Sequence, residues 1–194
     1  LQPLQRWSPL VRLPSGQWRC EGTNLPSQVA PGGDLWVQLP VAKGVVALPL
    51  ECRADAERVS DIDPVVRDPV QVQVIAEQSW RLANGRLSVE LDRSGLIRLQ
   101  DFRGVDQLSA PLQLRRYGDR GEFWDAWDLA ADYPQHQLPI TGDWVLELAE
   151  RGPLLARVIL RRSIGDSSMR MDVLLRADSP FVELQPVSYT HLRA

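Results

Sequence analysis

Apolar and polar residues alternate along many short segments of this sequence. The pattern is clearest at residues 34–39, 70–74, 87–91, 144–148 and 169–173. Side chains on a β-strand point alternately to the two faces of a sheet, so a period of two predicts strands with one buried and one hydrated face. Glycine and proline punctuate the chain, and a long stripe of helical spacing is absent. The sequence therefore predicts an all-β protein with antiparallel sheets. Only residues 49–59 are expected to coil briefly into a helix.

Turns are predicted where the alternation stops. Asn84-Gly85 lies between two apolar segments and predicts a tight hairpin turn, because both residues tolerate a positive φ. Residues 92–95 predict a second turn, and Gly165-Asp166 predicts the tip of a hairpin between two long strands. This spacing is typical of a meander, in which each strand pairs with the next.

The chain divides into two expected units. Residues 1–66 contain short apolar segments broken by proline and glycine, and they predict a small β-sandwich domain. A polar stretch at 55–68 is interpreted as a long loop or linker, and Pro69 opens the second unit. Residues 67–187 then predict the N-terminal part of a large antiparallel β-sandwich.

Composition excludes several classes of function. The 194 residues carry a formal net charge of −3, which argues against nucleic acid or an anionic membrane as a partner. An apolar run near the ~20 residues of a membrane span is absent, and the first residues lack the features of a signal peptide. We therefore expect a cytoplasmic protein. Cys20 and Cys52 lack metal-site spacing, and His136 and His191 lie in no ligand-like motif, so no metal or cofactor is expected within this chain.

One segment carries candidate site residues. Trp124, Asp125, Trp127 and Asp128 interleave two indole rings with two carboxylates. An indole packs on the apolar face of a pyranose, and a carboxylate accepts hydrogen bonds from vicinal hydroxyls, so this pattern favours a sugar-binding loop. The alternative is structural: the two rings plug the end of a β-sandwich, and the two aspartates cap its turn.

The hexapeptide Phe123-Trp124-Asp125-Ala126-Trp127-Asp128 resembles the Trp/Tyr-Asp-Ala-Trp-Asp segment in the C-terminal β-domains of α-mannosidases of glycoside hydrolase family 38. Other segments resemble the same region in the same order. They are Leu25-Pro26-Ser27-Gln28 in the small unit, the meander at 84–101, and the ribbon from Gly152 through the turn at 164–168. The resemblance departs from the family at Gln2, where asparagine is expected, and it ends at about Leu184.

The resemblance implies a fold and an activity. It implies a small β-sandwich followed by part of a large galactose-mutarotase-like sandwich, in a bacterial-type retaining enzyme that hydrolyses terminal α-mannosides. In this family two carboxylates about 5 Å apart perform the reaction, and zinc grips the mannose hydroxyls. The resemblance places these groups in an N-terminal α/β catalytic domain, which would be the partner of this region. No catalytic residue is therefore assigned here, and the fragment alone is expected to be inactive.

Trp124, Asp125, Trp127 and Asp128 would then reach the α-mannoside from the rim of that site. Two other classes stay open: a non-catalytic carbohydrate-binding sandwich, and a purely structural β-module. Residues 188–194 read Ser-Tyr-Thr-His-Leu-Arg-Ala, which looks like translated sequencing adapter. We interpret them as a non-native tail, which leaves the large sandwich truncated at its C-terminus.

Overall fold

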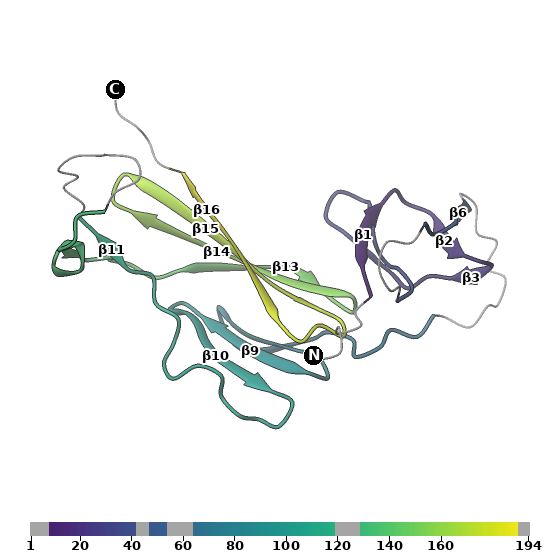
Figure 1. Ribbon diagram of the computed structural model, residues 1–194, viewed down its shortest axis with the longest axis horizontal. Helices are drawn as coiled ribbons and strands as arrows, with labels where there is room; N and C mark the ends of the chain where they lie inside the picture. The colour runs from purple at the N-terminus through teal and green to yellow at the C-terminus, as the bar shows by residue number, and fades with distance from the viewer. Residues whose placement is uncertain (1–7, 42–46, 54–63, 119–128, 190–194) are drawn as a thin grey trace.

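The computed structural model describes residues 8–41, 47–53, 64–118 and 129–189, and it is built from β-strands (Figure 1). The all-β prediction is confirmed. Every strand pair among the described residues is antiparallel, and a single 3₁₀ turn, η1 (Tyr133–Gln135), is the one helical element there. Within these same ranges, no helix is long and apolar enough to cross a membrane.

The N-terminal part of the chain forms two small sheets, which lie at the right of Figure 1. One has the order β1-β5-β4 and the other the order β3-β2-β6. Their strands are β1 (Leu10–Leu13), β2 (Gln17–Cys20), β3 (Thr23–Asn24), β4 (Ser27–Val29), β5 (Leu35–Gln38) and β6 (Leu50–Arg53). Cys20, Leu25 and Val37 form a small buried cluster between them. Since Leu50–Arg53 is a strand paired with β2, the expectation of a helical coil was wrong for these residues. Tertiary pairing outweighs the weak local helical preference there.

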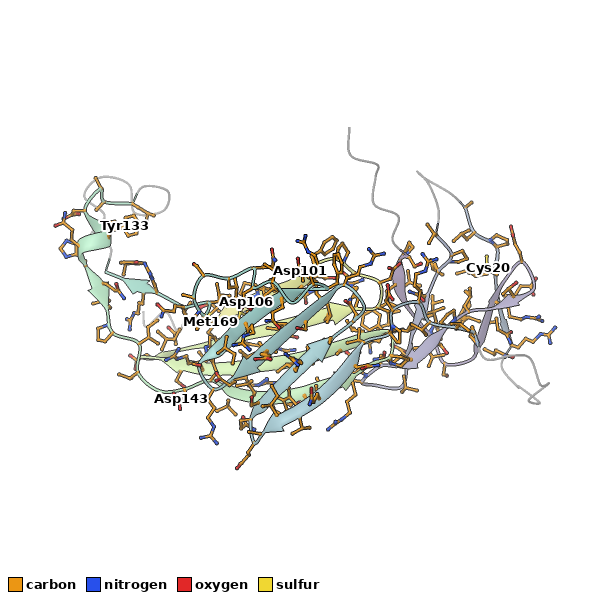
Figure 2. The ribbon with its side chains drawn as sticks, turned by 90° about the horizontal axis from the view of Figure 1, so that it is seen from below. Cys20, Asp101, Asp106, Tyr133, Asp143 and Met169 are labelled. Atoms are coloured by element: carbon orange, nitrogen blue, oxygen red, sulfur yellow. The ribbon has the colours of Figure 1, made fainter. Side chains whose placement is uncertain are left out.

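Two four-stranded sheets form the larger part of the protein. The first has the order β10-β9-β8-β7 and the second the order β13-β14-β15-β16. The strands of the first are β7 (Gln71–Ala76), β8 (Ser79–Ala83), β9 (Leu87–Asp92) and β10 (Gly95–Asp101). Those of the second are β13 (Val145–Arg151), β14 (Leu155–Ile164), β15 (Ser167–Arg176) and β16 (Val182–Tyr189). The two sheets stack as the layers of a sandwich (Figure 2).

The core of this sandwich lies between the two sheets. Leu82, Val89 and Leu91 from the first sheet, together with Val158 and Val173 from the second, have no exposed surface. Full burial of a side chain of this kind contributes about 1.5–3 kcal/mol, so the alternate apolar positions of the sequence supply the main stabilising term. The opposite face of the second sheet carries Arg157, Arg161 and Arg170, as the alternation predicts, but Ile159, Asp172 and Leu174 on that face are buried.

The hairpin between β8 and β9 is confirmed, but its turn works differently from the prediction. Neither Asn84 nor Gly85 has a positive φ. Instead, the side chain of Asn84 accepts hydrogen bonds from the backbone amides of Arg86 and Leu87, both at 2.8 Å. A Cβ atom at position 85 would lie 2.5 Å from a carboxylate oxygen of Asp68, so a larger residue there would have to displace that side chain. Close packing, rather than backbone freedom, accounts for this glycine.

Strand β16 extends to Tyr189, so Ser188 and Tyr189, the first two residues of the expected tail, pair with β15. Backbone pairing does not require a particular sequence, so the origin of the tail stays a prediction. The unit boundary predicted between residues 66 and 67 also stays a prediction, because the described chain has a gap at 54–63.

Candidate functional site

A short two-stranded arm projects from one end of the large sandwich. It consists of β11 (Arg116–Tyr117) and β12 (Gln137–Leu138), and η1 lies between them in sequence. The rings of Tyr117 and Tyr133 meet edge to face with centroids 5.2 Å apart, and the amide of Gly118 donates to the carbonyl of His136. Figure 2 shows Tyr133 at the far end of the molecule from Cys20. These contacts join residues of the arm to one another.

The predicted site residues Trp124, Asp125, Trp127 and Asp128 lie outside the described residues. Their flanks do not: the chain enters the segment from Gly118 and leaves it at Leu129, both next to the arm. The pairing of β11 with β12 places Gly118 beside His136, since the Gly118 amide lies 2.8 Å from the His136 carbonyl oxygen. The described residues that flank the candidate segment in sequence therefore belong to the arm or lie directly before it.

His136 follows η1 and pairs with an acidic residue of the same arm. Its Nε2 atom lies 2.9 Å from a carboxylate oxygen of Asp132, and both side chains are substantially exposed. Such a pair contributes little stability at a surface. Among the described residues, there is no group of three or more His, Cys, Asp or Glu side chains that could hold a metal ion. The zinc that the family resemblance implies therefore has no ligand set in the described part of this chain, and we assign none.

A second polar site, which the sequence did not reveal, joins the small sheets to the large sandwich. Gln28 on β4 is buried, with 9% of its surface exposed. Its Oε1 atom accepts from the amides of Leu154 and Leu155 at 2.8 and 2.9 Å, and its Nε2 donates to the carbonyl of Leu155 at 2.8 Å. One amide side chain thus satisfies three backbone groups at the turn before β14.

A charged network extends this junction across the sheet. Trp36 Nε1 on β5 donates to Glu150 Oε2 at 2.6 Å, and Arg157 donates to the other oxygen of Glu150. Arg157 also lies 3.6 Å from Asp172, whose two oxygens accept from Arg170 at 2.6 and 2.7 Å. The side chains of Glu150 and Asp172 are buried, 1% and 8% exposed. Two carboxylates and two guanidinium groups balance each other, so the interior carries no net charge here.

Sequence reasoning missed both parts of the junction, although some signals existed. Gln28 belongs to the Leu25-Pro26-Ser27-Gln28 segment, yet nothing local shows that it faces a second unit. A β-bulge between Leu148 and Glu150 shifts the alternation by one position just before Glu150. A bulge is not visible as a break in the alternating pattern, and so the burial of Glu150 was not predicted.

The architecture agrees with a comparison of the sequence with known families. Residues 82–186 match the C-terminal domain of glycosyl hydrolases family 38. This match covers more than half of the 194 residues. The chain belongs to glycosyl hydrolase family 38. No curated protein matches the sequence.

The part of the family 38 domain matched here begins in β8 and ends in β16. It includes both sheets of the sandwich except β7, and it includes the arm. The expected aromatic and acidic loop at 124–128 also falls within the match. The small sheets and the Gln28 junction lie outside it, so their relation to the family rests on the sequence resemblance described above.

Proposed function

We propose that this chain is the C-terminal β-region of a bacterial-type retaining α-mannosidase that hydrolyses terminal α-mannosides. The observation that carries the proposal is the family 38 match over residues 82–186, together with the Trp-Asp-Ala-Trp-Asp segment that lies inside it. In this proposal a separate zinc-dependent α/β domain of the same protein is the partner and contains the catalytic carboxylates. This chain supplies a rigid scaffold beside that domain.

The proposed contribution of this chain to the substrate site is the loop that contains Trp124, Asp125, Trp127 and Asp128. An indole at the rim would cover the apolar face of the mannose ring, and a carboxylate would accept hydrogen bonds from its hydroxyls. Strands β11 and β12, which flank this segment in sequence, pair with each other.

The first test uses the parent enzyme and 4-nitrophenyl α-mannoside, with the α-glucoside and α-galactoside as comparison substrates. We expect selective hydrolysis of the mannoside, and NMR of the first product should show the α-anomer, as double displacement requires. Hydrolysis of only another glycoside, or an initial β-anomer, would overturn the substrate class or the mechanism.

The second test isolates the loop. Trp124→Ala and Asp125→Ala in the parent enzyme should each lower turnover more than about tenfold with an unchanged melting temperature, since one lost transition-state contact is worth about 1.4 kcal/mol or more. Asp132→Ala is the matched control, because Asp132 is an exposed aspartate of the same arm that pairs with His136. Lower stability with normal turnover would instead identify a structural loop. Binding of α-mannosides by this chain alone would favour a carbohydrate-binding module.

A further inference from the structure

A groove of about 530 Å³ lies between the small sheets and the large sandwich. Asn24 and Gln38, at the ends of β3 and β5, line it from the small sheets, and Asp178, which precedes β16, lines it from the sandwich. Val41 and Val65 also line it and are 44% and 86% exposed, so the groove meets solvent beside two apolar side chains. A groove of this size accommodates a small ligand.

The side chain of Gln38 is buried at this groove without a hydrogen bond. Gln38 is 8% exposed, and its backbone amide donates to the carbonyl of Pro26 at 2.9 Å. Its side-chain amide, in contrast, has no hydrogen-bond partner within the described ranges of the chain. Buried polar side chains in proteins are almost always paired, so an unpaired amide at the wall of a groove indicates a group that a ligand can satisfy.

Asn24 adds a second unpaired group to the groove. Its side-chain oxygen Oδ1 is buried and lacks a hydrogen-bond partner among the residues that the structure describes. An unpaired buried acceptor costs free energy, so a ligand that brings an N–H donor to this end of the groove gains by pairing with it after the amide rotates. Asp178 is different, because Arg86 donates to its carboxylate at 2.5 and 2.8 Å. The free hydrogen-bonding groups are therefore neutral amides.

A neighbouring glutamine shows what such an amide binds in this protein. Gln28 lies on β4, which pairs with β5, and its side chain accepts from the amides of Leu154 and Leu155 and donates to the carbonyl of Leu155. One side-chain amide thus holds both kinds of backbone group at the junction of the small sheets with the sandwich. Gln38 offers the same donor and the same acceptor at the same junction.

We propose that this groove binds an extended peptide segment with aliphatic side chains, one peptide group of which pairs with the side-chain amide of Gln38. Aliphatic residues and prolines supply the apolar contacts for such a segment: Leu25, Pro26, Leu39, Pro40, Val41 and Val65. A neutral sugar fits less well, because none of the described lining residues is aromatic and a pyranose has no ring to pack on. The site does not depend on the proposed mannoside loop or on mannosidase activity.

The test is a ¹H–¹⁵N NMR titration of the 194-residue chain with acetyl-leucyl-leucine amide, a capped dipeptide with two aliphatic side chains. We expect the side-chain amide resonances of Gln38 to shift saturably, with a dissociation constant of about 1 mM. A probe in which an ester oxygen replaces the central peptide N–H should bind at least about threefold more weakly, because it cannot donate that hydrogen bond. N-acetylglucosamine, which has an amide but no aliphatic side chain, should bind more than about tenfold more weakly.

Gln38→Leu separates binding from folding. The variant should keep or raise the unfolding midpoint in urea, because it replaces an unpaired buried amide by an apolar side chain, and it should bind the dipeptide at least about fivefold more weakly. The peptide and ester probes should then bind this variant equally, as a double-mutant cycle requires. Gln73→Leu is the matched control, because Gln73 is an exposed glutamine on β7, and it should leave the affinity unchanged.

Three results would overturn the proposal. The first is the absence of a saturable shift at Gln38. The second is a lower unfolding midpoint in Gln38→Leu, which would assign the amide to the fold. The third is binding of N-acetylglucosamine as tight as that of the dipeptide, which would make the ligand an acetamido sugar.

Discussion

Replacement of Gln28 by alanine tests whether the junction joins the two parts of the protein into one cooperative unit. The side-chain amide accepts from two backbone N–H groups, those of Leu154 and Leu155, and donates to the Leu155 carbonyl. The carbonyl keeps a second donor in the variant, since the Gly152 amide also lies 2.9 Å from it. The two amides have no such substitute among the described contacts. Gln28→Ala therefore leaves two buried donors unsatisfied.

The magnitude follows from those two donors. A buried donor without a partner costs about 1–3 kcal/mol, so the variant should lose about 2–6 kcal/mol of unfolding free energy. Total stability of a domain is about 5–15 kcal/mol, so this is a large fraction. Among the described residues of the small sheets and their loops, the buried apolar side chains are few: Cys20, Leu25, Ala30 and Val37. They should therefore separate first and unfold at lower denaturant than the sandwich.

Urea unfolding followed by hydrogen exchange at residues 17–20 and 35–38 measures the effect. We expect one transition for the unmodified chain and an earlier exchange of these strands in Gln28→Ala. Gln73→Ala is the control, because Gln73 is an exposed glutamine on β7 and its replacement should change stability by less than about 0.5 kcal/mol. A loss below about 1 kcal/mol with unchanged exchange would refute the reasoning and would mean that water replaces the amide.

Three further predictions concern other elements. Hydrogen bonds from Arg103 and from the Val105 amide hold the pKa of Asp101 below its usual value. The contribution of ionised Asp101 to stability is therefore fully present above about pH 4, and it is lost as the pH falls through the lowered pKa. The stability difference between the unmodified chain and Asp101→Asn should accordingly shrink in urea titrations between about pH 5 and pH 2. Arg157→Met should lower the free energy of unfolding in urea by about 3–5 kcal/mol, because it leaves two buried carboxylates short of a cation. In the double variant, Glu150→Gln should restore part of that loss. Leu184→Lys should reduce self-association measured by sedimentation velocity, since β16 is an edge strand and Leu184 is 41% exposed. Unchanged association would show that copies of the chain do not meet at this edge.

The fold class could be predicted because burial follows the two-residue period of a strand. Val37, Val89 and Val173 are fully buried at positions within the alternating segments. The Gly85 turn could not be derived correctly, because the side chain that limits the space there is that of Asp68, a residue distant in sequence. The same holds for Gln28, whose partners are more than a hundred residues away. Local patterns specify which face of a strand is buried, but they do not specify which polar group lies opposite.

For the candidate site, the residue types were informative but the contacts they make were not. Its residue types indicated sugar chemistry, and the family match agrees with a glycosidase, yet neither establishes contact with a substrate. The structure contributes the position of the arm that flanks the loop in sequence. Strand β14 runs from the Gln28 junction at Leu155 to Ile164, next to Gly165, near which the guanidinium of Arg116 of the arm lies. The nine steps span about 31 Å at about 3.4 Å per residue.

This continuous strand has a mechanical consequence. Since β14 pairs with β15 along its length and with β13 from Ala156 to Arg161, it cannot bend within this stretch without breaking hydrogen bonds. The small sheets, bound at Leu154 and Leu155, and the arm, placed near Ile164, are therefore held at a fixed separation by one stiff element. If the arm serves a catalytic domain as proposed, loosening the junction by Gln28→Ala should leave the geometry of the arm intact. Turnover by the parent enzyme should then survive the loss of stability, whereas Trp124→Ala should lower turnover without that loss.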